Sequence, residues 1–176
     1  DYEAALGPDT GLILKVHPSN YRVEGFTSSV PVAELAALGV PLVADIGSGL
    51  LAPHPRLPDE PDAATTLRDG ASLVTASGDK LLGGPQCGLL LGEAGLVERL
   101  RRHPTARAVR VDKLTIAALE ATLTGPPVPV RIFVDTPVAA LLERAERLAA
   151  RLRADAVDAV AVSSRSPRRG SRREAP

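Results

Sequence analysis

The chain has 176 residues, of which 44% are hydrophobic and 24% are charged, with 21 basic and 21 acidic side chains. This composition is sufficient for a hydrophobic core, which excludes disorder throughout and predicts one domain or part of one. The apolar runs fall short of the ~20 residues that cross a bilayer, so we expect no transmembrane span and no signal peptide. One cysteine, Cys87, excludes an intrachain disulfide and favours a reducing, cytoplasmic location. The chain has no methionine, which predicts a processed or truncated protein.

The two kinds of charge are unevenly distributed. Residues 163–176 contain five arginines and one glutamate, a net charge of +4, so residues 1–162 carry a net charge of −4. This last segment is rich in Ser, Pro and Arg and lacks apolar periodicity, which predicts a disordered tail over residues 161–176. Such a tail is either a solvated terminus or a segment that binds nucleic acid, and the sequence leaves both open.

The first part of the chain predicts a parallel strand, helix, strand unit. Residues 11–16 (GLILKV) and 41–44 (PLVA) are short apolar runs of the kind found in buried strands. Between them, residues 31–38 (PVAELAAL) favour a short helix with proline in its first turn. A helix that joins two buried strands is typical of a parallel βαβ connection.

The middle of the chain adds more strands and helices. Residues 71–76 (ASLVTA) and 88–91 (GLLL) predict two strands, and helical spacing occurs over residues 62–68, 96–102 and 113–123. Together with the βαβ unit, these elements predict an α/β layer architecture.

The last part of the chain begins with a break at residues 124–129 (TGPPVP). The following residues, 130–134 (VRIFV), are predicted to form an edge strand or a connector. A long helix over residues 137–153 is then expected, with Thr136 as its N-cap and Pro137 at its first position.

Lys80 is the first candidate for chemistry. Only three lysines occur against eighteen arginines, and a lysine can lose its proton and form an imine, which an arginine cannot do. Lys80 follows the predicted strand 71–76 and precedes a Gly-rich turn, Gly83-Gly84, where the backbone can approach a ligand closely. From this local pattern, Lys80 is either a cofactor-bearing lysine or an ordinary surface lysine in a loop.

Asp45 strengthens the first interpretation, because it ends another apolar run, PLVA, thirty-five residues upstream of Lys80. In open α/β sheets, ligands bind at the carboxyl ends of the parallel strands, where both residues are expected. Pyridoxal phosphate needs this pair: a lysine for the Schiff base and a carboxylate that keeps the pyridine nitrogen protonated. No Walker-type phosphate loop and no metal-binding pattern competes with this prediction.

Four segments of the sequence resemble one enzyme family. They are KVHPSNYRVEGF (15–26), VADIGSGL (43–50), LVTASGDKLLGGPQCGLLLG (73–92) and RHPTARAVRVDKLTIAALEATL (102–123). In this order they closely resemble the L-seryl-tRNA(Sec) selenium transferases, the bacterial selenocysteine synthases. The resemblance implies the large-domain fold of a fold-type I, aspartate aminotransferase-like pyridoxal phosphate enzyme. It also implies a dimer-based homo-oligomeric ring.

The resemblance implies roles for the residues around the cofactor. Lys80 matches the Schiff-base lysine, and Asp45 matches the partner of the pyridine nitrogen. Asp79 matches an acidic position implicated in catalysis, either in protonation or in orienting Lys80. Ser77 is a candidate contact of the cofactor phosphate.

Four further residues are assigned to the substrates. Arg107 and Arg110 match an arginine pair that resembles a selenophosphate site, and two arginines three residues apart form a suitable fork for a tetrahedral oxyanion. Without the resemblance, these arginines are interpreted as part of a solvated basic face. Asn20 and Gln86 are weaker candidates for polar groups of the active site.

The activity implied is conversion of seryl-tRNA(Sec) to selenocysteinyl-tRNA(Sec) with selenophosphate, through a dehydroalanyl intermediate. We expect residues 1–125 to be the C-terminal part of the large domain and residues 126–160 the start of a truncated C-terminal small domain. Family segments that precede and follow this match are missing, so the chain is expected to be a partial copy. Two alternatives remain: a related pyridoxal phosphate lyase for a small amino acid or amino sugar, or a non-catalytic fragment.

Overall fold

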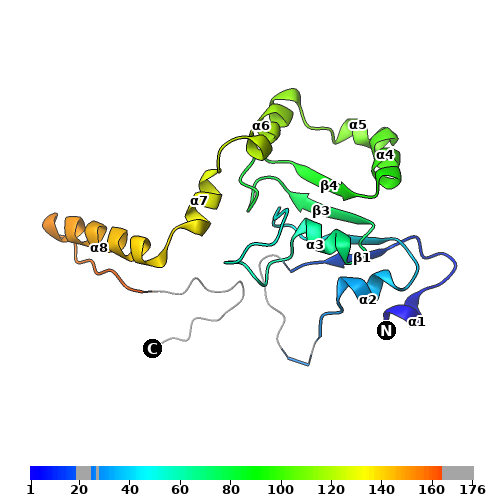
Figure 1. The fold of residues 1–176 in the computed structure, drawn as a ribbon, viewed down its shortest axis with the longest axis horizontal. Helices are drawn as coiled ribbons and strands as arrows, with labels where there is room; N and C mark the ends of the chain where they lie inside the picture. The colour runs from blue at the N-terminus through cyan, green and yellow to red at the C-terminus, as the bar shows by residue number, and fades with distance from the viewer. Residues whose placement is uncertain (19–24, 27, 164–176) are drawn as a thin grey trace.

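The computed structural model describes residues 1–18, 25–26 and 28–163, and its centre is a four-stranded sheet (Figure 1). The strands lie in the order β1-β2-β3-β4. The first three run parallel, and β4 pairs antiparallel with β3. Their bounds are Ile13–Val16 (β1), Leu42–Asp45 (β2), Leu73–Ser77 (β3) and Gly88–Gly92 (β4).

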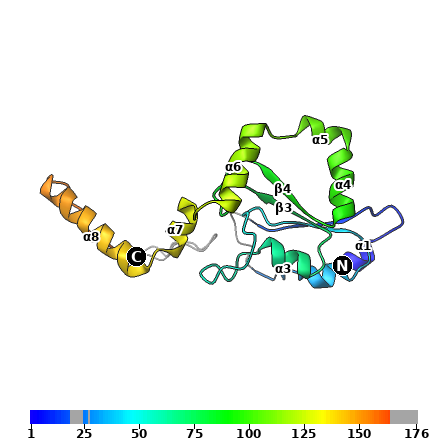
Figure 2. The same cartoon turned by 45° about the horizontal axis from the view of Figure 1, so that its top comes forward.

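Helices lie on both sides of this sheet. Figure 2 shows α4, α5 and α6 on one side of β3 and β4, and α3 on the other side. Two further helices, α7 and α8, extend away from the sheet in both views. The helices are α1 (Tyr2–Ala5), α2 (Val32–Ala36), α3 (Ala63–Arg68), α4 (Ala94–Arg102), α5 (Pro104–Ala108), α6 (Lys113–Thr124), α7 (Pro129–Asp135) and α8 (Val138–Ala154).

The hydrophobic core lies between the sheet and the helices α2 and α3. Alternate residues of β2 point into it: Leu42 and Ala44 are buried, whereas Val43 and Asp45 are half-buried. This alternation follows from the two-residue period of a strand. The larger group of buried core residues comprises Ala44, Ile46, Ala63, Ala71, Val74 and Ala76, and a second group comprises Ile13, Leu35 and Leu42.

The predicted βαβ unit is confirmed, because α2 lies between two strands that pair in parallel. The helix expected over residues 62–68 is also confirmed as α3. Asp62 caps this helix, accepting a hydrogen bond from the Thr65 backbone N–H at 2.9 Å. A side-chain oxygen at this position satisfies one of the helix's free N–H groups, so the helix begins here.

Two expectations for the last part of the chain are wrong. Of the two alternatives for residues 130–134, an edge strand or a connector, the strand is wrong, because these residues lie within α7. This helix has Pro129 in its first turn, where proline is tolerated. Thr136 is not the N-cap of the long helix. It is the C-cap of α7, its hydroxyl donates to the Ile132 carbonyl at 2.7 Å, and Pro137 is the N-cap of α8.

Several sequence predictions fall on residues for which placement is not described. Asn20 is one of these, as are residues 164–176 of the predicted tail. Within the described part of the chain, no helix combines the length and apolar character needed to span a membrane.

Candidate active site at the carboxyl ends of β2 and β3

Asp45 lies at the last position of β2 and is half-buried. The parallel register pairs it with Thr75 of β3, and the Thr75 hydroxyl donates a hydrogen bond to Asp45 Oδ1 at 2.8 Å. Within the described part of the chain, Oδ2 of Asp45 accepts no hydrogen bond. The carboxylate is therefore oriented by its neighbouring strand while one oxygen stays available to a ligand.

The loop that follows β2 contacts the end of β3. Gly49 has a φ of +78°, and a Cβ atom there would lie 2.1 Å from the carbonyl oxygen of Ser77. Only glycine allows this backbone conformation and this approach together. One residue earlier, the buried Ser48 accepts a hydrogen bond at its carbonyl from the Leu81 N–H at 2.8 Å. The Asp45 loop and the Lys80 turn are thus joined through their backbones.

The Lys80 turn is closed by hydrogen bonds of its own backbone. The Gly78 N–H donates to the Cys87 carbonyl and the Gly84 N–H to the Gly78 carbonyl, each at 2.8 Å. The Gly83 N–H donates to the Lys80 carbonyl at 3.0 Å. Both Lys80 and its neighbour Asp79 are exposed, so a rigid turn presents an accessible amine.

The structure brings only some of the predicted residues together. Asp45, Ser77, Asp79, Lys80 and Gln86 all belong to the two joined segments, with Ser77 half-buried and Gln86 exposed. The arginine pair is placed differently. Arg107 lies in the last turn of α5 and Arg110 lies beyond the end of that helix, and both are exposed. No hydrogen bond or ion pair among the described residues joins these arginines to the Lys80 turn.

Thr75 contacts the candidate site residue Asp45, and sequence reasoning missed it. Its position in an apolar strand gave no sign of a polar role. The signal lies in the register, which sets it directly beside Asp45, and register follows from strand pairing rather than from the local sequence.

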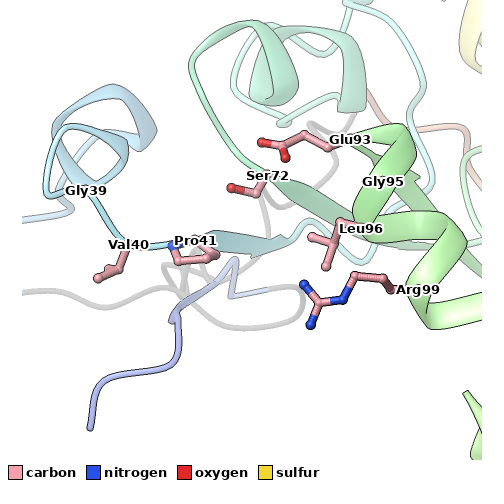
Figure 3. A pocket seen from close by; sticks show the side chains of 8 residues that line it. All are labelled: Gly39, Val40, Pro41, Ser72, Glu93, Gly95, Leu96 and Arg99. Carbon is pink, nitrogen blue, oxygen red and sulfur yellow. The ribbon is translucent and has the colours of Figure 1, made fainter. Parts of the chain in front are cut away.

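One groove of the described structure lies away from these residues. It has a volume of about 570 Å³ and is lined by residues that precede β2 and β3 and by α4 (Figure 3). Pro41 and Ser72 place it at the amino ends of these strands, so it is not the site of Asp45 and Lys80. A smaller groove of about 320 Å³ includes His17, whose backbone N–H donates to the Asp45 carbonyl at 2.8 Å.

The residues at this edge of the sheet fit pyridoxal phosphate. An exposed lysine and a carboxylate with one available oxygen stand on adjoining segments there. An accessible amine and an oriented carboxylate are the two groups that this cofactor requires.

Comparison with solved structures defines the type of fold. The structure of a D-glucosaminate-6-phosphate ammonia-lyase superposes with a TM-score of 0.59, covering 84% of this chain and 37% of that chain. The sequence identity is 19%, so this likeness concerns the α/β fold alone.

Comparison of sequences defines the family. The family model SelA, L-seryl-tRNA selenium transferase, matches residues 1–172, and the chain belongs to this family. The resemblance predicted from the four segments is therefore confirmed.

Three curated relatives, each named L-seryl-tRNA(Sec) selenium transferase, illustrate the match. The protein from Moorella thermoacetica is 47% identical over 170 residues, which cover 93% of this chain and 36% of the relative. The protein from Methylocella silvestris is 51% identical over 150 residues, which cover 82% of this chain and 32% of the relative. The protein from Klebsiella pneumoniae is 48% identical over 165 residues, which cover 88% of this chain and 36% of the relative. The chain thus spans about a third of the length of these relatives.

Proposed function

We propose that this chain is the lysine-bearing part of a pyridoxal phosphate enzyme that converts L-seryl-tRNA(Sec) to L-selenocysteinyl-tRNA(Sec) with selenophosphate as selenium donor. Membership of the family supports this activity. The observation that carries the proposal is the backbone hydrogen bond between the Asp45 loop and the Lys80 turn, because it joins the segment that bears the carboxylate to the segment that bears the amine.

Three residues would hold the cofactor. The Lys80 amine would attach to it covalently, the available oxygen of Asp45 would pair with the pyridine nitrogen, and the Ser77 hydroxyl would contact the phosphate. When bound, pyridoxal phosphate supplies an electron sink for negative charge at the α-carbon of the seryl group.

The remaining roles belong to side chains of this chain. The Lys80 amine would accept the α-proton at Nζ. Asp79 lies beside it in the sequence and either donates a proton to the departing hydroxyl or orients Lys80. Arg107 and Arg110 bind the selenophosphate oxyanion through charge-assisted hydrogen bonds. Gln86 and Asn20 contact the substrate as polar groups.

The proposal extends to the division of the chain into domains and to the assembly of the intact enzyme. Residues 1–125 would be the C-terminal part of a fold-type I large domain, and residues 126–160 the start of a small domain. The end of α6 at Thr124, with Gly125 as its C-cap, supports a boundary at this point. The family resemblance supports assembly of the intact enzyme from dimers.

Cofactor attachment is the first test. Pyridoxal phosphate is added to the chain, the bond to protein is fixed with borohydride, and the modified residue is located by peptide mass spectrometry. We expect modification at Lys80 that disappears in Lys80→Ala and persists in Lys113→Ala, a control at another exposed lysine. Absence of modification, or modification of all three lysines alike, would contradict the cofactor role.

The selenium donor requires a second test. This chain is exchanged for the matching segment of the Moorella thermoacetica relative, and formation of selenocysteinyl-tRNA is measured. Arg107→Ala and Arg110→Ala should each raise the KM for selenophosphate by about tenfold or more, the loss expected for a charge-assisted hydrogen bond. Arg144→Ala, an exposed arginine of α8, is the control. An unchanged KM in both variants would refute the oxyanion role.

A further inference from the structure

The loop after β2 is linked to α7 by a buried histidine, His54, whose side chain is 2% exposed. Its Nδ1 accepts a hydrogen bond from the Arg56 backbone N–H at 3.2 Å. A neutral imidazole that accepts at Nδ1 carries its proton on Nε2. His54 Nε2 therefore donates to Asp135 Oδ1, 3.0 Å away and 81 residues later in the chain.

Asp135 is a charged acceptor at the end of α7. Its other oxygen, Oδ2, accepts a hydrogen bond from Arg131 Nε at 2.7 Å, one helical turn earlier. This hydrogen bond to Arg131 is the main cause that lowers the pKa of Asp135, and the charge of Arg131 and the hydrogen bond from His54 act in the same direction. The Arg56 guanidinium adds a second link by donating to the Thr136 carbonyl at 2.9 Å.

The start of the same helix packs against the Lys80 turn. At Gly83, where φ is +75°, a Cβ atom would lie 2.5 Å from Cγ1 of Val130 and 2.7 Å from Cγ2 of Val128. Gly83 is also the residue whose N–H donates to the Lys80 carbonyl. A displacement of α7 would therefore be transmitted directly to the backbone of the turn.

The turn also contacts the loop to which His54 belongs. There the Leu81 N–H donates to the Ser48 carbonyl, and Ser48 is completely buried. The Lys80 turn thus contacts two segments, the loop after β2 and α7. The hydrogen bond between His54 and Asp135 ties these two segments together.

We propose that His54 and Asp135 are positioning residues, which hold the loop and α7 against the Lys80 turn and so keep the lysine in place for attachment of the cofactor. This inference rests on the proposed function only in taking Lys80 as the cofactor lysine. Neither residue is assigned a contact with substrate or cofactor.

Asp135 is the better position for a test, because its side chain is 47% exposed and its replacement leaves the core intact. Asp135→Ala removes the acceptors of both His54 and Arg131. Asp135→Asn keeps an amide oxygen for His54 but loses the ion pair with Arg131. Arg131→Gln is the matched control, since it disrupts the ion pair within α7 and leaves the link to His54.

Hydrogen exchange of the chain without cofactor gives the first measurement. The amides of Leu81 and Gly83 should exchange about tenfold faster in Asp135→Ala, the effect of one lost hydrogen bond to a charged group. They should exchange at nearly the original rate in Asp135→Asn and Arg131→Gln. Faster exchange confined to residues 54–56 and 131–136 would overturn the proposal, and so would equal acceleration in all three variants.

Attachment of pyridoxal phosphate, followed by borohydride trapping at Lys80, gives the second measurement. Asp135→Ala should slow attachment by a factor similar to that seen in exchange, and Asp135→Asn should restore it. Faster exchange of the Leu81 and Gly83 amides with an unchanged rate of attachment would refute the positioning role. Absence of attachment in the unsubstituted chain would instead contradict the proposed function, while the exchange experiment would still report whether the link holds the turn.

Discussion

Replacement of Gly49 by alanine tests the contact between the two segments of the site. The new Cβ would lie 2.1 Å from the Ser77 carbonyl oxygen and 3.3 Å from Cβ of Leu82. The first of these distances involves backbone, which cannot rotate away as a side chain can. Either the loop after β2 or the end of β3 must therefore move.

The size of the effect follows from two contributions. Alanine at a φ of +78° adopts a left-handed conformation that costs ~1–2 kcal/mol. Insertion of an extra carbon into a packed region typically costs ~1–3 kcal/mol. The free energy of unfolding should therefore fall by about 2–5 kcal/mol, a large part of the ~5–15 kcal/mol by which domains are stable.

Urea denaturation followed by circular dichroism measures this loss. With a slope of ~2 kcal/mol per molar urea, the midpoint should fall by roughly 1–2.5 M. Gly95→Ala is the matched control, because Gly95 lies in α4 and a Cβ there meets nothing within 4 Å. Alanine should leave stability unchanged or raise it by up to ~1 kcal/mol at this position. Equal midpoints for the two variants would show that the loop does not press on Ser77 as described.

Three further changes probe the site, the helix surface and the core. Thr75→Val removes the hydroxyl that orients Asp45 and should weaken cofactor attachment by about tenfold; unchanged attachment would show that Asp45 needs no such partner. The hydrogen bond from Arg101 is the main cause that lowers the pKa of Glu98 to about 2. The stabilising effect of ionised Glu98 on α4 should therefore be complete above pH 4.5 and be lost as the pH falls towards 2. An NMR titration of Arg101→Ala should give a higher pKa for Glu98. Leu35→Ala, at a side chain 1% exposed, should cost about 2–5 kcal/mol in urea denaturation, and a loss below ~1 kcal/mol would contradict the core assignment.

The strands of the sheet, and the positions of Asp45 and Lys80 at the ends of two of them, were predictable because their signals are local. Short apolar runs mark buried strands, and Asp45 and Lys80 follow two of them directly. The rule that ligands bind at the carboxyl ends of parallel strands then placed both residues at one edge. The structure agrees with this rule in one respect: a hydrogen bond between Ser48 and Leu81 joins the segment of Asp45 to the segment of Lys80.

The failure at α7 has a different cause. Val130, Ile132 and Phe133 are residue types enriched in strands, which made residues 130–134 resemble one. The helix is favoured instead by contacts that no local pattern reports. Val130 packs on Gly83, and Asp135 at the end of the helix accepts the hydrogen bond from His54. Tertiary contacts of this kind regularly override local propensity.

The same contacts show why the lysine pattern by itself was ambiguous. A lysine in a Gly-rich turn is a common surface feature, and Lys80 is indeed exposed. What distinguishes this turn is that its glycine, Gly83, receives side chains from a segment about fifty residues later in the chain. The proposed boundary near residue 125 would therefore separate two domains that meet at the Lys80 turn. If residues 126–160 belong to a small domain, that domain contacts the turn that bears Lys80. Substitutions in α7 should then alter the attachment of pyridoxal phosphate at Lys80 without contact between α7 and the substrate.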